Sequence, residues 1–486
     1  MNLKHIAMQG LLLTWSSVFY SQILNFISKI VLTRFLFPED FGIMSLILSI
    51  TSVINIIFTL GWTEKLIQKK ENIEQAFQTV FTFLIIVGVI STSVMCICAP
   101  LIAQYFSTPS LTSLLRLYSL MFILFPISIL YNTYLQKYFL FSKKIMCEIL
   151  SSTLFFVTVI GLAYFGFGVW SLVIGQVIQI FFVVGWLYFF AREWNPHFSF
   201  NKQIFIEVLN FVKESGVGNI LGILILTIDN LFIGKYAGVT ALGYYSMAFA
   251  LTTLFITVIT ISIGNVIFPV LTITPKKEDL KRHFIKAVHL NFVILTPLLF
   301  FSFLFAEPLI TLLFSEKWIP SIILFKVLLI YTFFRAYCSL GSYLSLSLNS
   351  PHANKKIFFL ELLCLSISLF PFYFFFGIVG IAYAVLLSRI LSALLFAYFA
   401  KKTIMFSLKE HLLLFYKPVF LSAILSAISY YGYSVHIISS LFISFILIGI
   451  AYVLFYGILI ISIDGTVRQE LQELIALLQK NIAKHI

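Results

Sequence analysis

The sequence predicts an all-α integral membrane protein that crosses the bilayer many times. Of its 486 residues, 60% are hydrophobic and only 10% are charged, whereas soluble domains average about 45–50% apolar and about 25% charged residues. The apolar segments, such as 41–60 and 79–99, are continuous runs of roughly 20 residues, which is the length of a membrane-spanning helix. They lack the period-two alternation of barrel strands. Lipid is therefore the expected solvent, and helices satisfy the backbone hydrogen bonds within it.

Apolar runs along the chain give about 14 candidate transmembrane helices. They lie near 11–36, 41–61, 79–105, 113–135, 145–165, 168–190, 212–235, 241–272, 284–305, 319–347, 357–376, 378–400, 414–433 and 436–463. The first run is too long for a signal-peptide core and no small-residue cleavage site follows it, so we expect it to be retained. After the last run, apolar residues recur at helical spacing, which predicts an amphipathic cytoplasmic tail over 466–486.

Lysines and arginines are distributed very unequally between the two sides of this arrangement. One side carries nearly all of them, in a ratio of roughly eight to one, and the other side has only Arg34, Lys235 and Lys317. Basic connections stay in the cytoplasm, so we expect both termini on the inner face of the cytoplasmic membrane. The net charge of +13 is thus a topology signal and an attraction for anionic lipid headgroups. No nucleic-acid partner is expected.

A weak internal repeat divides the chain into two halves. Arg34 and Gly42 recur at the same spacing as Lys235 and Gly243. Further short matches follow in order, pairing 100–107 with 308–315, 143–145 with 355–357, and 168–170 with 380–383. Each copy holds about six helices, an even number, so both copies enter the membrane from the same side, as in parallel-repeat transporters. The repeat predicts a central cavity between two six-helix lobes at 1–200 and 201–405, followed by two additional helices at 406–465.

An ordered series of short motifs accompanies the predicted helix ends. They are LTRFLFPEDFG at 32–42, GWTEKLIQ at 61–68, GVWSLV at 168–173, DNLFIGKYAG at 229–238 and AEPLI at 306–310. Together they resemble bacterial polysaccharide-export flippases of the Wzx-like type, which belong to a superfamily with multidrug exporters and lipid II flippases. The resemblance implies export of undecaprenyl-diphosphate-linked oligosaccharide from the inner to the outer leaflet, for surface polysaccharides such as O-antigen lipopolysaccharide. It assigns no functional residue.

Charged residues inside predicted helices are the candidate site residues, because an intramembrane charge costs about 2.5 kcal/mol or more unless it serves a cavity or an ion partner. Arg335 and Arg389 lie near the middle of their helices, and Lys29 lies more than one turn inside the first. We expect these three to bind the diphosphate or acidic sugars. Asp229, at a similar depth, is expected to pair with Lys29 or to carry a coupling cation. The structural alternative is a Lys29–Asp229 ion pair with both arginines satisfied by backbone carbonyls. Glu361 is expected to reach the inner surface.

Two other function classes remain open at this point. An ion-coupled multidrug or small-molecule antiporter on the same scaffold is the first alternative, although exporters of cationic drugs usually need buried carboxylates, and here intramembrane cations are in excess. A membrane-embedded polysaccharide polymerase or ligase is less favoured, because the expected external connections are short. The chain has no G-x-x-x-x-G-K-[ST] loop and no metal-like spacing of histidines or cysteines, so we expect no catalytic residue, metal or cofactor. The expected partners are the lipid-linked oligosaccharide and membrane lipids. A coupling cation, proton or sodium, and a polysaccharide polymerase stay open as further partners.

Overall fold

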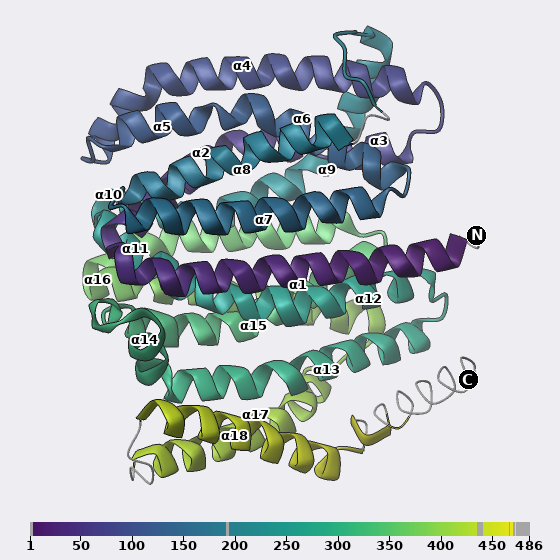
Figure 1. The fold of residues 1–486 in the computed structure, drawn as a ribbon. Coiled ribbons are helices and arrows are strands. Elements are labelled where there is room, and N and C mark those ends of the chain that lie inside the picture. The colour runs from purple at the N-terminus through teal and green to yellow at the C-terminus, as the bar shows by residue number, and fades with distance from the viewer. Residues whose placement is uncertain (1–2, 191–193, 435–440, 466, 470–471, 473–486) are drawn as a thin grey trace, which may run out of the picture. The chain divides into compact units, whose positions relative to one another are not determined.

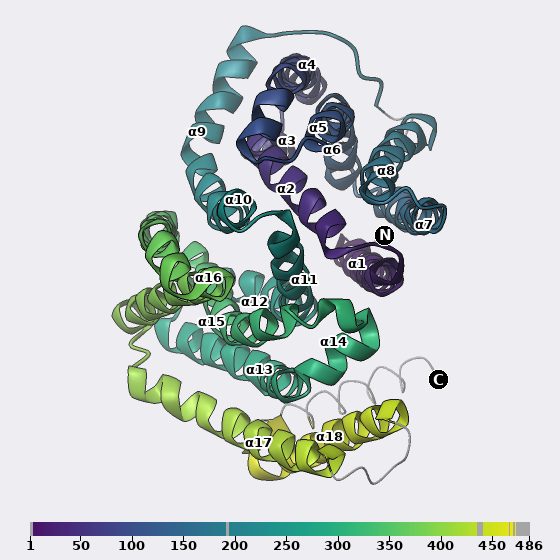
Figure 2. The ribbon, with the colours of Figure 1, turned by 90° about the vertical axis from the view of Figure 1, so that its left-hand side faces the viewer.

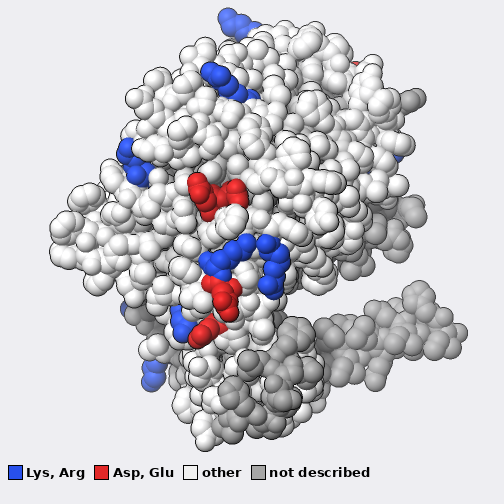
Figure 3. All heavy atoms as spheres, turned by 60° about the vertical axis from the view of Figure 1, so that its left-hand side comes forward, with Lys and Arg blue, Asp and Glu red and all other residues white. Residues whose placement is uncertain are grey.

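The computed structural model describes the whole chain except residues 1–2, 191–193, 435–440, 466, 470–471 and 473–486, and every element in the described part is a helix (Figure 1). Within it, 12 helical segments are long and apolar enough to cross a membrane. Figure 3 shows a face on which charged side chains are sparse. The prediction of a multi-pass helical membrane protein is confirmed, while the count of about 14 transmembrane helices and the internal repeat stay predictions.

The chain divides into two compact units, of which the first comprises residues 1–247 and 362–381. Its elements are α1 (Leu3–Phe35), α2 (Pro38–Asn55), η1 (Ile56–Thr59), α3 (Trp62–Gln68), α4 (Ile73–Tyr105), α5 (Leu111–Ser119), α6 (Met121–Lys137), α7 (Phe141–Tyr164), α8 (Val169–Phe190), α9 (Lys202–Ile225), α10 (Ile228–Tyr236), the beginning of α11 (Val239–Phe255) and the middle of α16 (Pro351–Ile404). Helices α1, α7 and α8 lie side by side (Figures 1 and 2). Hydroxyl groups join α1 to α7, at 2.9 Å between Tyr20 and Thr153 and 2.9 Å between Ser21 and Ser152.

The second unit comprises residues 248–361 and 382–486. Its elements are the rest of α11, the π-helical η2 (Ile256–Ile261), α12 (Ser262–Ile273), α13 (Lys277–Leu304), α14 (Ala306–Phe314), η3 (Glu316–Trp318), α15 (Ser321–Ser347), both ends of α16 (Pro351–Ile404), α17 (Leu408–Ser434) and α18 (Leu441–Ile463). Helices α17 and α18 pack on α13 (Figure 2). The hydroxyls of Tyr452 and Tyr456 on α18 donate to the α13 carbonyls of Pro297 and Val293, each at 2.9 Å.

Several boundaries differ from those expected from apolar runs. The predicted helix at 212–235 is interrupted between Ile225 and Ile228. At this interruption the Thr227 hydroxyl donates a hydrogen bond to the Ile223 carbonyl at 2.7 Å. Such local hydrogen bonds compete with the regular helical ladder. The predicted tail at 466–486 lies outside the described residues apart from 467–469 and 472. The proposed division at 1–200, 201–405 and 406–465 stays a prediction.

Helix α16 is a hairpin of two helices rather than one straight rod. Its 54 residues would extend about 81 Å if straight, far beyond the roughly 30 Å core of a bilayer. Gly377 interrupts it with φ 58° and ψ −141°, a conformation that glycine adopts without steric cost. The two arms then run close together, because a Cβ on Gly380 would lie only 1.9 Å from the Phe372 carbonyl oxygen. The arms correspond to the predicted helices at 357–376 and 378–400.

Two glycines let α2 and α11 cross at backbone distance within the first unit. A Cβ on Gly42 would lie 1.7 Å from the carbonyl oxygen of Val239, and a Cβ on Gly243 would lie 1.8 Å from the carbonyl oxygen of Pro38. Each helix therefore places a first-turn carbonyl where the other helix has no side chain, the kind of close approach that small residues permit between membrane helices. Gly42 and Gly243 are also the two glycines that the sequence repeat equates.

Candidate functional site

A buried ion pair joins the two arms of α16 in the second unit. The Arg389 Nη2 atom lies 2.8 Å from Glu361 Oε1, and these side chains are 9% and 0% exposed. Ser392, on the same arm as Arg389, donates its hydroxyl to the other Glu361 oxygen. The expectation that Glu361 reaches the inner surface is wrong, because the hairpin turns this carboxylate toward the opposite arm.

Helix α15 holds the Arg389 side chain from its other side. Tyr331 accepts a hydrogen bond from Arg389 Nη2 at 3.2 Å, and the guanidinium carbon lies 5.3 Å from the centre of the Tyr331 ring. Cys338 donates its thiol to the Arg389 carbonyl at 3.8 Å. Residues 331 and 338 are seven positions apart and therefore lie on one face of α15. The Arg389 guanidinium is thus oriented by the Glu361 carboxylate and the Tyr331 side chain, while the Cys338 thiol binds the Arg389 main chain.

Arg335 lies on the same face of α15 but has different surroundings. It is half-buried, and its Nη1 donates to the Thr253 hydroxyl on α11 at 3.2 Å. Its guanidinium carbon lies 5.5 Å from the centre of the Phe249 ring, and it is within electrostatic reach of Glu361. The structural alternative predicted that backbone carbonyls would bind both arginines. The contacts described for Arg335 and Arg389 are instead made by side chains.

These side chains form one connected group, which we call the arginine cluster. Its members are Phe249, Thr253, Tyr331, Arg335, Glu361 and Arg389. The rings of Phe249 and Tyr331 lie 5.9 Å apart and connect the surroundings of the two arginines. With two guanidinium groups and one carboxylate, the cluster carries one net positive charge. Its more exposed cation is Arg335, which is suited to bind an anion.

The other two predicted site residues lie in the first unit and are not brought together. Asp229 is 2% exposed at the start of α10 and accepts hydrogen bonds from the Tyr245 hydroxyl at 2.5 Å and the Asn230 amide at 2.8 Å. Lys29 is half-buried on α1. The described residues include no ion pair between Lys29 and Asp229. The expected pairing is therefore not found, while a substrate-binding role for Lys29 and an ion-coupling role for Asp229 stay predictions.

Sequence reasoning did not single out Tyr331 and Tyr245, and it assigned Glu361 to the inner surface. The position of Glu361 relative to the turn could have predicted its pairing with Arg389. Glu361 lies 16 residues before Gly377, and Arg389 lies 12 residues after Gly377. With both arms rising about 1.5 Å per residue, the two charges stand at similar depths. In the described part of the chain, no group of three or more histidine, cysteine or acidic side chains could hold a metal ion.

Comparison with known proteins identifies the family. The model of a family described as "Polysaccharide biosynthesis protein" matches residues 31–323, more than half of the chain. The teichuronic acid biosynthesis protein TuaB of Bacillus subtilis is 26% identical over 278 residues, covering 57% of this chain and 57% of TuaB. The succinoglycan biosynthesis transport protein ExoT of Rhizobium meliloti is 25% identical over 300 residues, covering 61% and 60%. The chain thus spans less than two thirds of the length of these relatives.

Solved structures show the same fold at low sequence identity. The lipid II flippase MurJ in an inward closed conformation aligns with a TM-score of 0.76 and 14% identity, covering 93% of this chain and 99% of MurJ. An inward-facing multidrug resistance MATE transporter aligns with a TM-score of 0.65 and 16% identity, covering 79% and 94%. The fold of this chain is therefore shared with these two membrane proteins. Together with the family match, this confirms the resemblance to polysaccharide exporters, and the chain belongs to the polysaccharide biosynthesis protein family.

Proposed function

We propose that this protein is a flippase that moves undecaprenyl-diphosphate-linked oligosaccharide from the inner to the outer leaflet of the bacterial cytoplasmic membrane. Relatives in its family are named for teichuronic acid, succinoglycan and lipopolysaccharide biosynthesis, and its fold is shared with a lipid II flippase. Each of these names concerns a glycan or a lipid-linked glycan. An amphiphile of this kind needs a protein that screens its polar head from the acyl chains during transfer.

The observation that carries the proposal is the arginine cluster. A charged side chain at the centre of a membrane helix costs about 2.5–3.5 kcal/mol, so three such groups within one unit indicate a function. A guanidinium group binds phosphate through paired hydrogen bonds, which suits the diphosphate linkage. Arg335 would make this contact, because it is half-buried whereas Arg389 is buried, so its guanidinium is the more accessible of the two. Arg389, which is neutralised by Glu361, would position Tyr331 and join the contact if the acid moved away.

Alternating access is the proposed transport mechanism. The sequence repeat supports it, since two like-oriented halves can rock around a central cavity. The close crossing at Gly42 and Gly243 also supports it, because these are the two glycines that the predicted repeat equates. In this scheme both termini face the cytoplasm, as the distribution of lysine and arginine predicts. A polymerase partner stays an open part of the scheme, as does a coupling cation, proton or sodium.

The alternative of an ion-coupled multidrug antiporter fits the cluster less well, because guanidinium groups outnumber carboxylates in it and would repel a cationic drug. A polymerase or ligase is less favoured, since the relative ExoT is named a transport protein and the matched structures are transporters.

The test is export in cells that lack this gene and carry a variant on a plasmid. Loss of a charge-assisted contact costs about 1.5–3 kcal/mol, or roughly ten- to hundredfold. We therefore expect Arg335→Ala and Arg389→Ala to abolish most surface polysaccharide while the protein still inserts in the membrane. Undecaprenyl-linked oligosaccharide should accumulate on the inner leaflet, and Arg335→Lys should retain part of the export.

A matched control is Arg116→Ala in the first unit, where an exposed arginine donates to the Cys96 carbonyl at 3.3 Å. This variant should export normally. Normal export from both Arg335→Ala and Arg389→Ala, at equal protein levels, would exclude the proposed role of the arginine cluster.

A further inference from the structure

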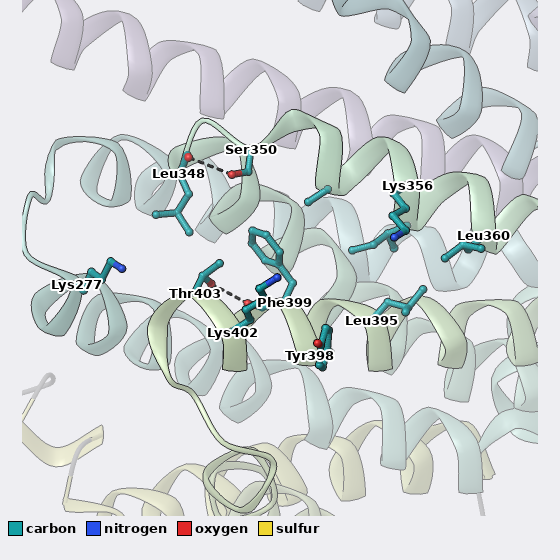
Figure 4. A pocket seen from close by; sticks show the side chains of 12 residues that line it. Lys277, Leu348, Ser350, Lys356, Leu360, Leu395, Tyr398, Phe399, Lys402 and Thr403 are labelled. Carbon is teal, nitrogen blue, oxygen red and sulfur yellow. Dashed lines mark hydrogen bonds between the residues drawn. The ribbon is translucent and has the colours of Figure 1, made fainter.

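A cavity opens between the two arms of α16 at the ends remote from the hairpin turn. Its volume is about 600 Å³, and Lys356 and Lys402 line it from the two arms while Lys277 lines it from the first turn of α13. Figure 4 shows the three lysines along this cavity, with Lys402 between Lys277 and Lys356. All contributing residues belong to the second unit. A volume of this size is typical of ligand pockets, which measure about 300–1,000 Å³.

The three lysines carry no compensating charge. Each is exposed, and in the described part of the chain none of them has an ion-pair partner. No aspartate or glutamate is among the lining residues. Three positive charges around one opening repel one another in the empty site. An anion between them would relieve this repulsion.

Most of the other lining residues are apolar, and Ser350, Tyr398 and Thr403 add hydroxyl groups. Leu360 follows Lys356 by four residues on one arm, and Leu395 precedes Lys402 by seven on the other, which places these leucines about 6 Å and 10 Å further along. Phe399 lies between Leu395 and Lys402 along the second arm of α16. The cavity therefore combines a rim of exposed lysines with a mostly apolar wall, as an anionic lipid combines a charged head with acyl chains.

We propose that this cavity, the lysine-rimmed cavity, binds an anionic phospholipid of the inner leaflet. The phosphate would lie among Lys277, Lys356 and Lys402, and an acyl chain would pass between Leu360 and Leu395. The lysines all lie on the side that the distribution of basic residues assigns to the cytoplasm, where anionic headgroups are found. A bound lipid would join α13 to both arms of α16, the hairpin that carries Glu361 and Arg389. This inference does not depend on the transported substrate.

The test measures lipid binding to the full-length protein purified in a neutral detergent, by native mass spectrometry. Phosphatidylglycerol and phosphatidylcholine with the same acyl chains are the two probes. We expect phosphatidylglycerol to bind and phosphatidylcholine to bind much more weakly. One lysine near an anionic surface contributes about 1 kcal/mol, which corresponds to about a fivefold change in affinity. The triple variant Lys277→Gln, Lys356→Gln, Lys402→Gln should therefore weaken phosphatidylglycerol binding by up to about a hundredfold.

The matched control is the triple variant Lys276→Gln, Lys401→Gln, Lys409→Gln. It removes the same charge from exposed lysines that do not line the cavity, and it should bind phosphatidylglycerol like the unmodified protein. Leu360→Trp, which fills the interior and leaves the rim intact, should also weaken binding.

Three outcomes would overturn the proposal. They are equal losses in the two triple variants, equal binding of the two lipids, and displacement of phosphatidylglycerol by millimolar inorganic phosphate. The last result would indicate a site for a soluble anion instead.

Discussion

The two units of this protein stabilise buried acidic groups in different ways. In the first unit, Asp229 accepts hydrogen bonds from the Tyr245 hydroxyl and from a backbone amide, which are neutral donors. In the second unit, Glu361 is held by Arg389 at 2.8 Å. A carboxylate with neutral donors loses one hydrogen bond when a donor is removed, whereas an ion pair leaves an uncompensated charge when either partner is removed. The second unit should therefore be the more sensitive to substitution.

The largest effect is expected from Glu361→Ala. It leaves the Arg389 guanidinium buried without its acid, and breaking a buried pair from one side costs about 3–5 kcal/mol. Unfolding in detergent, followed by a thermal melting curve, measures the loss. The double variant Glu361→Ala, Arg389→Met should recover most of this stability, because it buries no charge. If the double variant were as unstable as the single one, packing rather than charge would explain the effect.

A smaller effect is expected at the crossing of α2 and α11, which tests how far backbone packing stabilises the first unit. The Gly243→Ala methyl group would lie 1.8 Å from the Pro38 carbonyl oxygen, so the helices must separate. Overpacking of this kind typically costs about 1–3 kcal/mol. Gly218→Ala is the control, because nothing lies within 4 Å of its added Cβ. Melting temperatures compare the two variants, and similar values would argue against a tight crossing.

Tyr245→Phe tests the comparison between the two units directly, because it removes one neutral hydrogen-bond donor from Asp229. An unmade hydrogen bond at a buried acceptor costs about 1–3 kcal/mol, and we expect the lower part of this range because the Asn230 amide remains. Tyr188→Phe, at an exposed tyrosine, should change the melting temperature little. A loss at Tyr245 as large as that at Glu361 would remove the contrast between the units.

The smallest effect is expected at the surface of the first unit. Lys69 and Lys65 donate to Glu207 and lower the pKa of this carboxyl, at distances of 2.6 Å and 3.1 Å. A lowered folded-state pKa adds stability above the ordinary glutamate pKa of about 4.3, and this stability disappears as the pH falls through the folded value. Glu207 is half exposed, so the gain is at most about 1 kcal/mol. The stability difference between the protein and Glu207→Gln should be largest near pH 7 and disappear in acid.

The sequence was sufficient to predict where the helices lie along the chain. It was insufficient to predict which side chains of neighbouring helices face one another. Continuous apolar runs predicted the two arms of α16, and the bend near Gly377 followed from the gap between them. Side-chain pairing depends on helix rotation and register, which apolar runs do not encode. The described residues include no Lys29–Asp229 ion pair, because a similar depth in the membrane does not make two side chains neighbours. The Tyr245 hydroxyl, which donates to Asp229, lies on the next helix, 16 residues further along the chain.

The single-residue turn at Gly377 also bears on how the chain enters the membrane during its synthesis. Two helices with almost no connecting loop leave the insertion machinery as one hairpin. Glu361 and Arg389 can then partition into lipid as a neutral pair, whereas each alone would oppose insertion by about 2.5–3.5 kcal/mol. The acid that holds Arg389 in the finished protein would thus have assisted its biogenesis.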